Sequence, residues 1–216
     1  MDELNKYISK LREDFTKGKL NKQDVHQNPA IQFETWLNQA VEAKIPEVQA
    51  MTLSTVSKNN SPSSRIVYLR EFGENQFYFY GNYSSRKALQ LKENSNACLN
   101  FFWPQLERQI RIEGHVKICD DAISDAYFNA RPIESKIGAW ASQQSEELVS
   151  REELEKCVEK FKNKFEGQEI KRPPYWGGWI FKANYYEFWQ GRKSRLHDRI
   201  CYNLKNTDWS INRIAP

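Results

Sequence analysis

A tryptophan and a cluster of positive charges occur together in the stretch EFWQGRKSRLHDR, residues 187–199. Arg195, His197 and Arg199 alternate along the chain, so an extended backbone would place all three on one side, near Trp189. Like charges converge at a cost unless an anion joins them. A tryptophan face with converging cations would suit a flat, anionic, electron-accepting ring. The alternative is a basic hairpin end that water and the neighbouring aspartate screen.

Two further segments have residue types that bind phosphate. SSRK (Ser84–Lys87) would place hydroxyls and two cations at the start of a helix, where free backbone N–H groups favour an anion. In RIVYLR, a spacing of five puts Arg65 and Arg70 on opposite faces of a regular strand, so they could serve two different sites unless a bulge realigns them. The alternatives are an ordinary capped helix and two strand-end arginines in water.

A third segment, YFNARPIES, combines a phenol, a guanidinium and a hydroxyl. Tyr127 and Arg131 lie four residues apart, on one helical face, and Ser135 follows a proline-directed turn. Together they would form an anion cradle. The amide-rich segment after it could donate hydrogen bonds to a phosphate through Gln144 and Ser145. The alternatives are ordinary packing of an arginine on an aromatic ring and a surface loop.

The composition describes a soluble globular protein. The 216 residues are 39% hydrophobic and carry 32 Lys and Arg against 28 Asp and Glu. A net charge of +4 is too balanced for a protein that coats nucleic acid, so a positive site must come from local placement of charge. The N-terminus is too polar for a signal peptide, and no apolar run approaches the roughly 20 residues that cross a bilayer. We therefore expect a cytoplasmic protein.

Several common catalytic and metal-binding motifs are absent. The chain has no GxGxxG, no Walker phosphate loop, no GxSxG and no HExxH. Its four cysteines lack metal-ligand and CxxC spacing, and its three histidines are isolated from them, so we expect reduced thiols and no metal site. If the protein is an enzyme, an organic cofactor would carry the difficult chemistry.

The hydrophobic periodicity predicts an α+β fold, mainly antiparallel β, with peripheral helices. Helices are expected over residues 4–15, from the cap at Asn28–Pro29, and over residues 84–94, 120–132 and 150–167. Strands are expected in meander-like order over residues 51–57, 63–72, 76–82, 97–103, 107–119, 179–190, 198–204 and 208–215. We expect a single domain, 1–216, in which residues 1–20 form an N-terminal helical flap.

Taken together, these stretches resemble the pyridoxine/pyridoxamine 5′-phosphate oxidase family of FMN enzymes. The similar segments run nearly end to end in the family's order: LREDFTKG, RIVYLR, FYGNYSSRKA, LERQIRIEG, YFNARPIESKIGAWASQQS, PPYWGG, EFWQGRKSRLHDR and INRIAP. RPxxSxIGAWxSxQS and EFWQGxxxRLHDR are specific signatures, whereas SSRKA alone is not. The resemblance implies an FMN-binding split barrel of Greek-key type and a homodimer with the flavin at the subunit interface.

The resemblance also implies a role for each matching residue. FMN would contact Arg65, Ile66, Val67, Tyr68, Leu69, Arg70, Tyr80, Gly81, Arg86, Lys87, Gln109, Gln144 and Ser145, with Trp189 and Arg199 arriving from the partner subunit. The substrate phosphate would lie among Arg70, Tyr127, Arg131 and Ser135. Arg195 and His197 would be the catalytic pair over the substrate's pyridine ring, and Arg12 a lid contact.

The implied reaction is the oxidation of pyridoxine 5′-phosphate or pyridoxamine 5′-phosphate to pyridoxal 5′-phosphate, with O2 reduced to H2O2, in vitamin B6 salvage or biosynthesis. His197 could orient the substrate or accept a proton, and both roles stay open. Two positions depart from the family pattern: Arg70 replaces an expected lysine, and Phe15 a frequent tyrosine. The competing interpretations are a non-catalytic flavin- or pyridoxal-phosphate-binding relative and a nucleic-acid-binding barrel.

Overall fold

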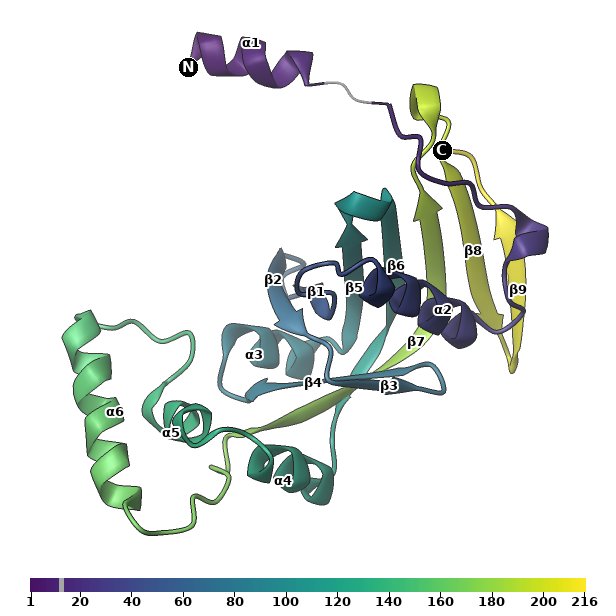
Figure 1. Ribbon diagram of the computed structural model, residues 1–216. Helices are drawn as coiled ribbons and strands as arrows, with labels where there is room; N and C mark the ends of the chain where they lie inside the picture. Colours follow the sequence, from purple (N-terminus) through teal and green to yellow (C-terminus); the bar gives the residue numbers. More distant parts are fainter. Residues whose placement is uncertain (12–13) are drawn as a thin grey trace. The chain divides into compact units, whose positions relative to one another are not determined.

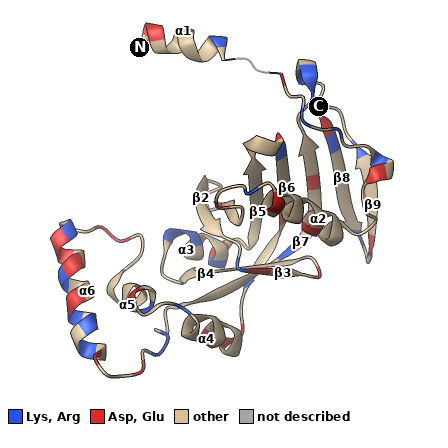
Figure 2. Ribbon diagram, in the orientation of Figure 1, with Lys and Arg blue, Asp and Glu red and all other residues tan. Residues whose placement is uncertain are grey.

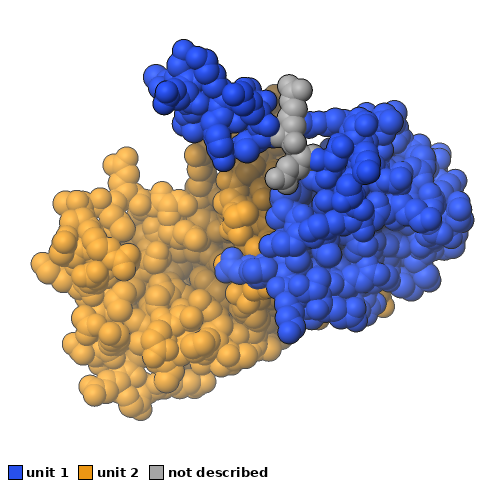
Figure 3. Space-filling model, turned by 45° about the horizontal axis from the view of Figure 1, so that its top comes forward, with its two compact units in different colours: residues 1–48, 100–112, 185–216 blue, residues 49–99, 113–184 orange. Residues whose placement is uncertain are grey.

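The computed structural model describes residues 1–11 and 14–216, so the predicted lid residue Arg12 lies outside the described part of the chain. The chain divides into two compact units (Figure 3). Unit 1 contains residues 1–48, 100–112 and 185–216, and unit 2 contains residues 49–99 and 113–184. Each unit is assembled from segments that are distant in the sequence. That the two units form one domain, with residues 1–20 as a flap, stays a prediction.

Unit 2 contains a sheet whose two edges are joined by consecutive residues. Its strands are β1 (Ala50–Val56), β2 (Pro62–Tyr68), β3 (Glu71–Gly73), β4 (Gln76–Asn82) and parts of β5 (Asn96–Trp103), β6 (Arg108–Ile118) and β7 (Trp176–Gln190). They follow the order β2-β1-β5-β6-β7-β4-β3 (Figure 1). Leu69 N–H donates to the Gln49 carbonyl and Arg70 N–H to the Tyr78 carbonyl, both at 2.9 Å. Because these two residues connect the ends of the strand order, the sheet closes as a barrel does, and the predicted fold class, mainly antiparallel, is confirmed.

The predicted strand over residues 63–72 is divided in two. β2 pairs antiparallel with β1, whereas β3 pairs with β4. β4 continues into the sheet by pairing with β7, from Gln76 opposite Lys182 to Asn82 opposite Trp176. The predicted single strand is therefore wrong, because the chain changes its pairing partner at Leu69 and Arg70, although each half pairs antiparallel with the strand expected next to it.

Four helices belong to unit 2: α3 (Arg86–Glu93), α4 (Asp121–Asn129), α5 (Ile133–Ala141) and α6 (Arg151–Phe165). The predicted start of the helix at residue 150 is confirmed, since Ser150 caps α6 and its hydroxyl accepts a hydrogen bond from the Glu153 N–H at 3.3 Å. Helix α6 ends just before Gly167, whose φ of +68° suits a glycine. The sequence did not predict α5, which follows Pro132 and buries Ile137, Ala139 and Ala141.

Unit 1 contains α1 (Asp2–Lys10), α2 (Pro29–Glu42), β8 (Asp198–Lys205), β9 (Asp208–Arg213) and the remaining parts of β5, β6 and β7. The Asn28 side chain accepts a hydrogen bond from the Ala30 N–H at 2.9 Å, so the predicted start of α2 is confirmed. Phe33 and Trp36 of α2 make edge contacts with Phe101 and Phe188 of the strands. Helix α1 buries none of its residues. Within the described ranges, no helix has the length and apolarity needed to cross a membrane.

Candidate functional site

Unit 2 contains a cavity of about 580 Å³, which we call the cationic cavity. Strands β2 and β4, helices α3, α4 and α5, and the start of β7 all contribute to it. Its lining residues are Arg65, Ile66, Val67, Tyr68, Arg70, Tyr80, Lys87, Tyr127, Ala130, Arg131, Pro132, Ser135, Gln144 and Trp176. All of these except Ala130, Pro132 and Trp176 are site residues predicted from the sequence. The fold therefore brings together four sequence segments that the motifs marked separately.

The cationic cavity has a strong and uncompensated positive charge. Arg65, Arg70, Lys87 and Arg131 line it, and none of the described residues that line it is a carboxylate. The pKa of Lys87 is lowered to about 8, first by burial and then by the positive charge of Arg65. Burial and the charge of Arg86 likewise lower the pKa of Arg65. Cations that destabilise one another in a partly dry site favour a bound anion.

Arg65 and Arg70 face the same cavity, which corrects the expectation that they would serve opposite faces of a strand. The prediction assumed a regular strand through both residues. Strand β2 instead ends at Tyr68, and Arg70 lies in the two-residue connection to β3. The alternation of a regular strand therefore does not extend from one arginine to the other.

Lys87 is buried at the start of α3, with neutral partners. Its ammonium donates to the Ser85 hydroxyl at 2.8 Å and to the Gln144 side-chain carbonyl at 3.0 Å. A Cβ atom at Gly81 would lie 3.3 Å from the Lys87 Nζ, so the glycine leaves space for the ammonium. Arg86 is exposed in the first turn of the same helix. The start of α3 thus presents two cations and free backbone N–H groups to an anion.

Stacked aromatic rings form another part of the wall of the cationic cavity. Tyr80 stacks on Tyr127 with 3.7 Å between ring centroids, and Trp176 stacks parallel to both at 5.9 and 6.2 Å. The Arg131 guanidinium lies 4.5 Å from the centre of the Trp176 ring. Arg131 Nη1 is buried and has no hydrogen-bond partner among the described residues. A buried guanidinium N–H that no described acceptor satisfies indicates that a ligand supplies the acceptor.

Unit 1 contains a separate aromatic cluster around His197. The centroids of His197 and Trp189 are 4.6 Å apart, and Phe15 makes edge contacts with both rings at 5.5 and 5.7 Å. The Arg192 backbone N–H donates to His197 Nδ1 at 3.1 Å. Burial and the positive charge of Arg195 lower the pKa of His197. Because Nδ1 accepts a hydrogen bond, the neutral form of the ring carries its proton on Nε2, and the lowered pKa favours this form.

Arg199 is fixed by a buried carboxylate. Its Nε donates to Glu187 Oε1 at 2.7 Å, and its Nη1 donates to the Ala215 carbonyl at 2.9 Å. Arg111 Nη2 donates to the other oxygen of Glu187 at 2.7 Å, and the Tyr185 hydroxyl to the same oxygen at 3.1 Å. Glu187 is only 3% exposed. Glu187 is thus the centre of a charged network that includes its two arginine partners.

Comparison with known proteins identifies the family. The profile described as "Pyridoxamine 5'-phosphate oxidase" matches residues 37–165, and the "Pyridoxine 5'-phosphate oxidase C-terminal dimerisation region" matches residues 176–216. The pyridoxine/pyridoxamine 5′-phosphate oxidase of Nostoc punctiforme is 48% identical over 214 residues, covering 99% of this chain and 100% of the relative. The chain belongs to the pyridoxine/pyridoxamine 5′-phosphate oxidase family. The oxidase of Cytophaga hutchinsonii is also 48% identical and covers 97% of this chain.

Solved structures give the same fold. PhzG from Burkholderia lata, solved in complex with tetrahydrophenazine-1-carboxylic acid, has a TM-score of 0.86 and 27% identity, and covers 91% of this chain and 98% of its own. An FMN-binding protein related to pyridoxamine 5′-phosphate oxidase, from Nostoc punctiforme, has a TM-score of 0.69 and 18% identity, and covers 88% and 98%. The second structure supports the split-barrel fold alone.

The site residues expected of a pyridoxine/pyridoxamine 5′-phosphate oxidase fall into two groups. One group lines or adjoins the cationic cavity in unit 2, as described above. The other group belongs to unit 1: Gln109, Trp189, Arg195, His197 and Arg199. Leu69 lies beside the cavity-lining segment but is buried at 6% exposure and does not line the cavity. Ser145 is exposed with a φ of +77°, and Arg195 is exposed with a φ of +64°.

Sequence reasoning missed three residues that the structure places in or beside the cationic cavity. Trp176 stacks on Tyr127 and Arg131, although the motif PPYWGG that contains it was recognised. Thr55 and Gln90 are buried polar residues that hydrogen-bond to each other at 2.6 Å beside Arg65. A polar residue inside an otherwise periodic strand or helix gives no signal of its own. Only the strand pairing of β1 with β2 brings Thr55 to Arg65.

Proposed function

We propose that this chain is an FMN-dependent oxidase that converts pyridoxine 5′-phosphate or pyridoxamine 5′-phosphate to pyridoxal 5′-phosphate, with O2 reduced to H2O2, in vitamin B6 metabolism. The observation that supports this most strongly is the cationic cavity, which has four cations and no carboxylate among its described lining residues. Two phosphate-bearing ligands explain why so much charge is gathered there. When bound, FMN would supply the acceptor for the two electrons that the substrate's 4′ carbon loses.

The proposed division of the cavity follows the contacts of its cations. Arg65 and Lys87 are buried or half-buried beside the start of α3 and would hold the FMN phosphate, with Arg86, Gln144 and Ser145 around it. At the other end of the cavity, burial and, to a smaller extent, the positive charge of Arg70 lower the pKa of Arg131. With Tyr127 and Ser135, these two arginines would hold the substrate phosphate. Arginine at position 70 can grip a phosphate with two N–H groups, where a lysine would act as a point charge.

The geometry of His197 favours an orienting role over a basic one. Its Nδ1 lone pair is occupied by the Arg192 N–H, and in the neutral ring Nε2 carries the proton. His197 would therefore donate Nε2–H to the substituent on the 4′ carbon of the substrate, and Arg195 would lie over the pyridine ring. Neither step requires His197 to accept a proton.

The variant His197→Asn tests this role. An asparagine retains a neutral N–H donor, so kcat should fall by less than about tenfold, whereas loss of a general base costs about 10²–10⁴-fold. Steady-state kcat from pH 6 to 9 is the measurement, and His115→Asn, at an exposed histidine, is the matched control. A thousandfold fall in kcat with the Asn variant, and none in the control, would show that His197 is a base.

The lowered pKa of Lys87 predicts a pH-dependent affinity for FMN. A phosphate binds the charged ammonium form, which in the ligand-free protein is almost fully populated at pH 7 and half deprotonated at about pH 8. FMN affinity should therefore change little from pH 7 to 7.5, where the flavin phosphate is already a dianion, and decrease above pH 8, by up to about tenfold per pH unit. Titrations of flavin fluorescence at each pH measure it. Lys87→Arg should remove this decrease, and a variant that retains it would assign the titration to another group.

We further propose that the chain is a homodimer with FMN at the subunit interface. Support comes from the match to a dimerisation region over residues 176–216 and from an apolar groove in unit 2. Leu89 and Ile118 line this groove and are 53% and 60% exposed, beside the buried Val116 and Trp179. A second copy would cover these side chains. A sedimentation mass of one chain at micromolar concentration would contradict the proposal.

The decisive experiment is an absorbance spectrum of the protein with FMN, before and after anaerobic addition of pyridoxine 5′-phosphate. We expect the flavin band to bleach and to return in air with formation of H2O2. A flavin that stays oxidised would favour the alternative, a non-catalytic flavin- or pyridoxal-phosphate-binding protein. A protein that does not bind added FMN would overturn the cofactor assignment itself.

A further inference from the structure

We infer that Gln90 is a positioning residue for phosphate binding, which holds the Arg65 guanidinium through two hydroxyl groups and places no negative charge beside it. The inference rests on the proposed FMN phosphate site and names residues that do not touch the ligand. The described acceptors that orient Arg65 are all neutral. The full positive charge of Arg65 is thereby left for the phosphate.

The contacts form a directed chain of hydrogen bonds. Gln90 is 5% exposed on α3, and its side-chain oxygen accepts from the Thr55 hydroxyl at 2.6 Å and from the Ser63 hydroxyl at 2.7 Å. The same hydroxyls accept from Arg65, Thr55 from Nη1 at 2.7 Å and Ser63 from Nη2 at 2.6 Å. Because each hydroxyl donates its one proton to Gln90, its lone pairs face the guanidinium.

Two backbone carbonyls complete this set of acceptors. Arg65 Nη1 also donates to the carbonyls of Leu53 at 2.9 Å and Ser63 at 3.1 Å. Strand pairing places these groups correctly, since Leu53 lies opposite Arg65 and Thr55 opposite Ser63 in the β1–β2 register. Gln90 follows Arg86 by four residues and Lys87 by three, so it lies on their side of α3. We call the contacts of Gln90, Thr55 and Ser63 with Arg65 the clamp. The clamp links Arg65 of β2 to the start of α3, which carries the other two cations.

Outside the cationic cavity, Arg108 also has neutral acceptors, the side-chain oxygens of Gln39 and Gln190, but several other arginines are held by carboxylates. Arg111 and Arg199 share the carboxylate of Glu187, and Arg192 and Arg213 share that of Asp198. Arg172, also in unit 2, binds two aspartates of α4 at 2.6 Å. A carboxylate fixes a guanidinium but neutralises its field, whereas hydroxyls and carbonyls fix it and leave the field intact.

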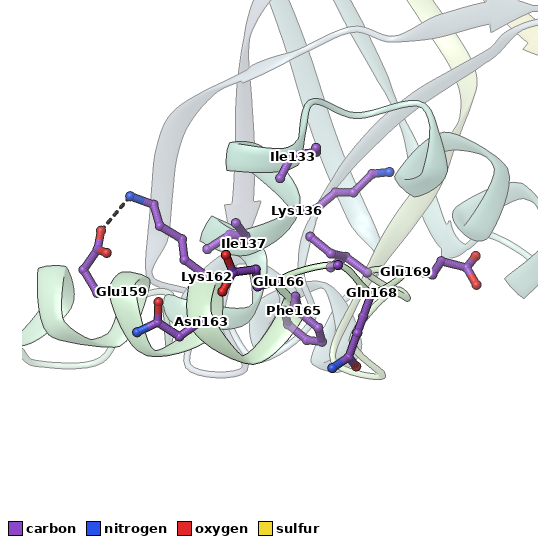
Figure 4. Close-up of a pocket in the computed structure, with 12 residues that line it drawn as sticks. Ile133, Lys136, Ile137, Glu159, Lys162, Asn163, Phe165, Glu166, Gln168 and Glu169 are labelled. Atoms are coloured by element: carbon purple, nitrogen blue, oxygen red, sulfur yellow. Dashed lines mark hydrogen bonds and ion pairs between the residues drawn. The ribbon is translucent and has the colours of Figure 1, made fainter.

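A second cavity of unit 2 gives a useful contrast. It lies between α5, α6 and the segment after α6, and it mixes acidic with basic side chains (Figure 4). Lys162 donates to Glu159 at 2.6 Å, and Glu166 and Glu169 also line it. Helix α6 as a whole also carries both acidic and basic residues (Figure 2). Side chains of opposite charge thus lie together elsewhere in unit 2. In contrast, the described residues that line the cationic cavity include no carboxylate.

The test compares FMN with riboflavin, which has the same ring system and no phosphate. The full chain, freed of flavin, is titrated with each ligand, and quenching of flavin fluorescence gives the two dissociation constants. Gln90→Glu keeps the size of the side chain and adds a negative charge. It should weaken FMN binding by about 10–100-fold, the range of one charged hydrogen bond, and leave riboflavin binding within about twofold. Gln168→Glu, at an exposed residue that does not line the cationic cavity, adds the same charge and should change neither.

A second variant, Ser63→Ala, removes one hydroxyl of the clamp at a half-buried position that tolerates the change in size. It should weaken FMN binding by about 3–10-fold, again without an effect on riboflavin. Equal losses for both ligands would show that Gln90 and Ser63 only support the fold, and unchanged FMN binding would refute the clamp. If the unmodified chain bound riboflavin as tightly as FMN, the phosphate site of the proposed function would fail, and the clamp with it. A preference for FMN that neither variant lowers would refute the clamp alone.

Discussion

Replacing Arg131 with glutamine is expected to lower kcat/KM for pyridoxine 5′-phosphate by about 10²–10³-fold, while the affinity for FMN stays unchanged. The guanidinium lies on the Trp176 ring at 4.5 Å, and its Nη1 has no acceptor within the described part of the chain. Such a group can make two charge-assisted hydrogen bonds to a phosphate without giving up a contact with the protein. Glutamine removes both the charge and one of these bonds.

Pyridoxine without its phosphate provides the internal control for this prediction. The variant and the unmodified chain should oxidise it at the same low rate, because the lost contacts are those to the phosphate. Arg151→Gln, at a surface arginine of α6 that pairs with Glu155, should behave as the unmodified chain with both substrates. Equal losses with and without the phosphate would mean that Arg131 supports the ring stack and not the ligand.

The parts of the fold that depend on short-range signals could be predicted from the sequence. The cap at Asn28 and the cap at Ser150 each satisfy an N–H group two or three residues away. Local hydrogen bonds of this kind are encoded within a few residues, so a single sequence is enough to identify them. Helix α5 was missed because Pro132 suggested a turn and the amide-rich residues 138–145 a surface loop, although Ile133, Ile137 and Ala141 have helical spacing.

The long-range features could not be predicted. The division of residues 63–72 into β2 and β3 depends on which neighbour each half pairs with, and those neighbours, β1 and β4, are chosen by the closure of the sheet. For the same reason, the spacing of Arg65 and Arg70 predicted opposite faces, while both residues line one cavity. The alternation rule holds within one strand and fails where the strand ends.

Most of the candidate site came from motifs, and the structure adds the residues between them. The resemblance named cations and aromatics that are expected to touch ligands, and eight segments of sequence were enough for that. Residues that act through another residue were not identified in this way: Gln90 lies outside the eight segments, and Glu187 begins EFWQGRKSRLHDR but had no role assigned to it. Their roles depend on distances of 2.6–2.7 Å that only the folded chain provides.

Among the substitutions proposed for unit 1, Glu187→Gln is expected to cause the largest decrease in the free energy of unfolding. The carboxylate is 3% exposed and binds two arginines, whose side chains are 39% and 26% exposed. Breaking a buried ion pair costs about 3–5 kcal/mol, and the partial exposure of the arginines reduces this to about 2–4 kcal/mol. The midpoint of thermal unfolding should fall by about 4–16 °C. Glu155→Gln, at an exposed pair with Arg151, should change the free energy of unfolding by less than about 0.5 kcal/mol.

The pH dependence of this effect follows from the pKa of Glu187. Burial alone would raise that pKa, but the hydrogen bond from Arg199 and the charge of Arg111 outweigh burial and lower it. A carboxyl group with a lowered pKa stabilises the fold above its unfolded-state pKa, about 4.3, and loses this contribution as the pH falls through the folded value. The difference between the unmodified chain and Glu187→Gln, from urea unfolding, should thus be constant from pH 7 to 5 and shrink below about pH 4. A difference in the free energy of unfolding that persists at the lowest pH would mean that Glu187 stabilises the fold by packing and not by its charge. The position of Arg199 would then not depend on its ion pair with Glu187.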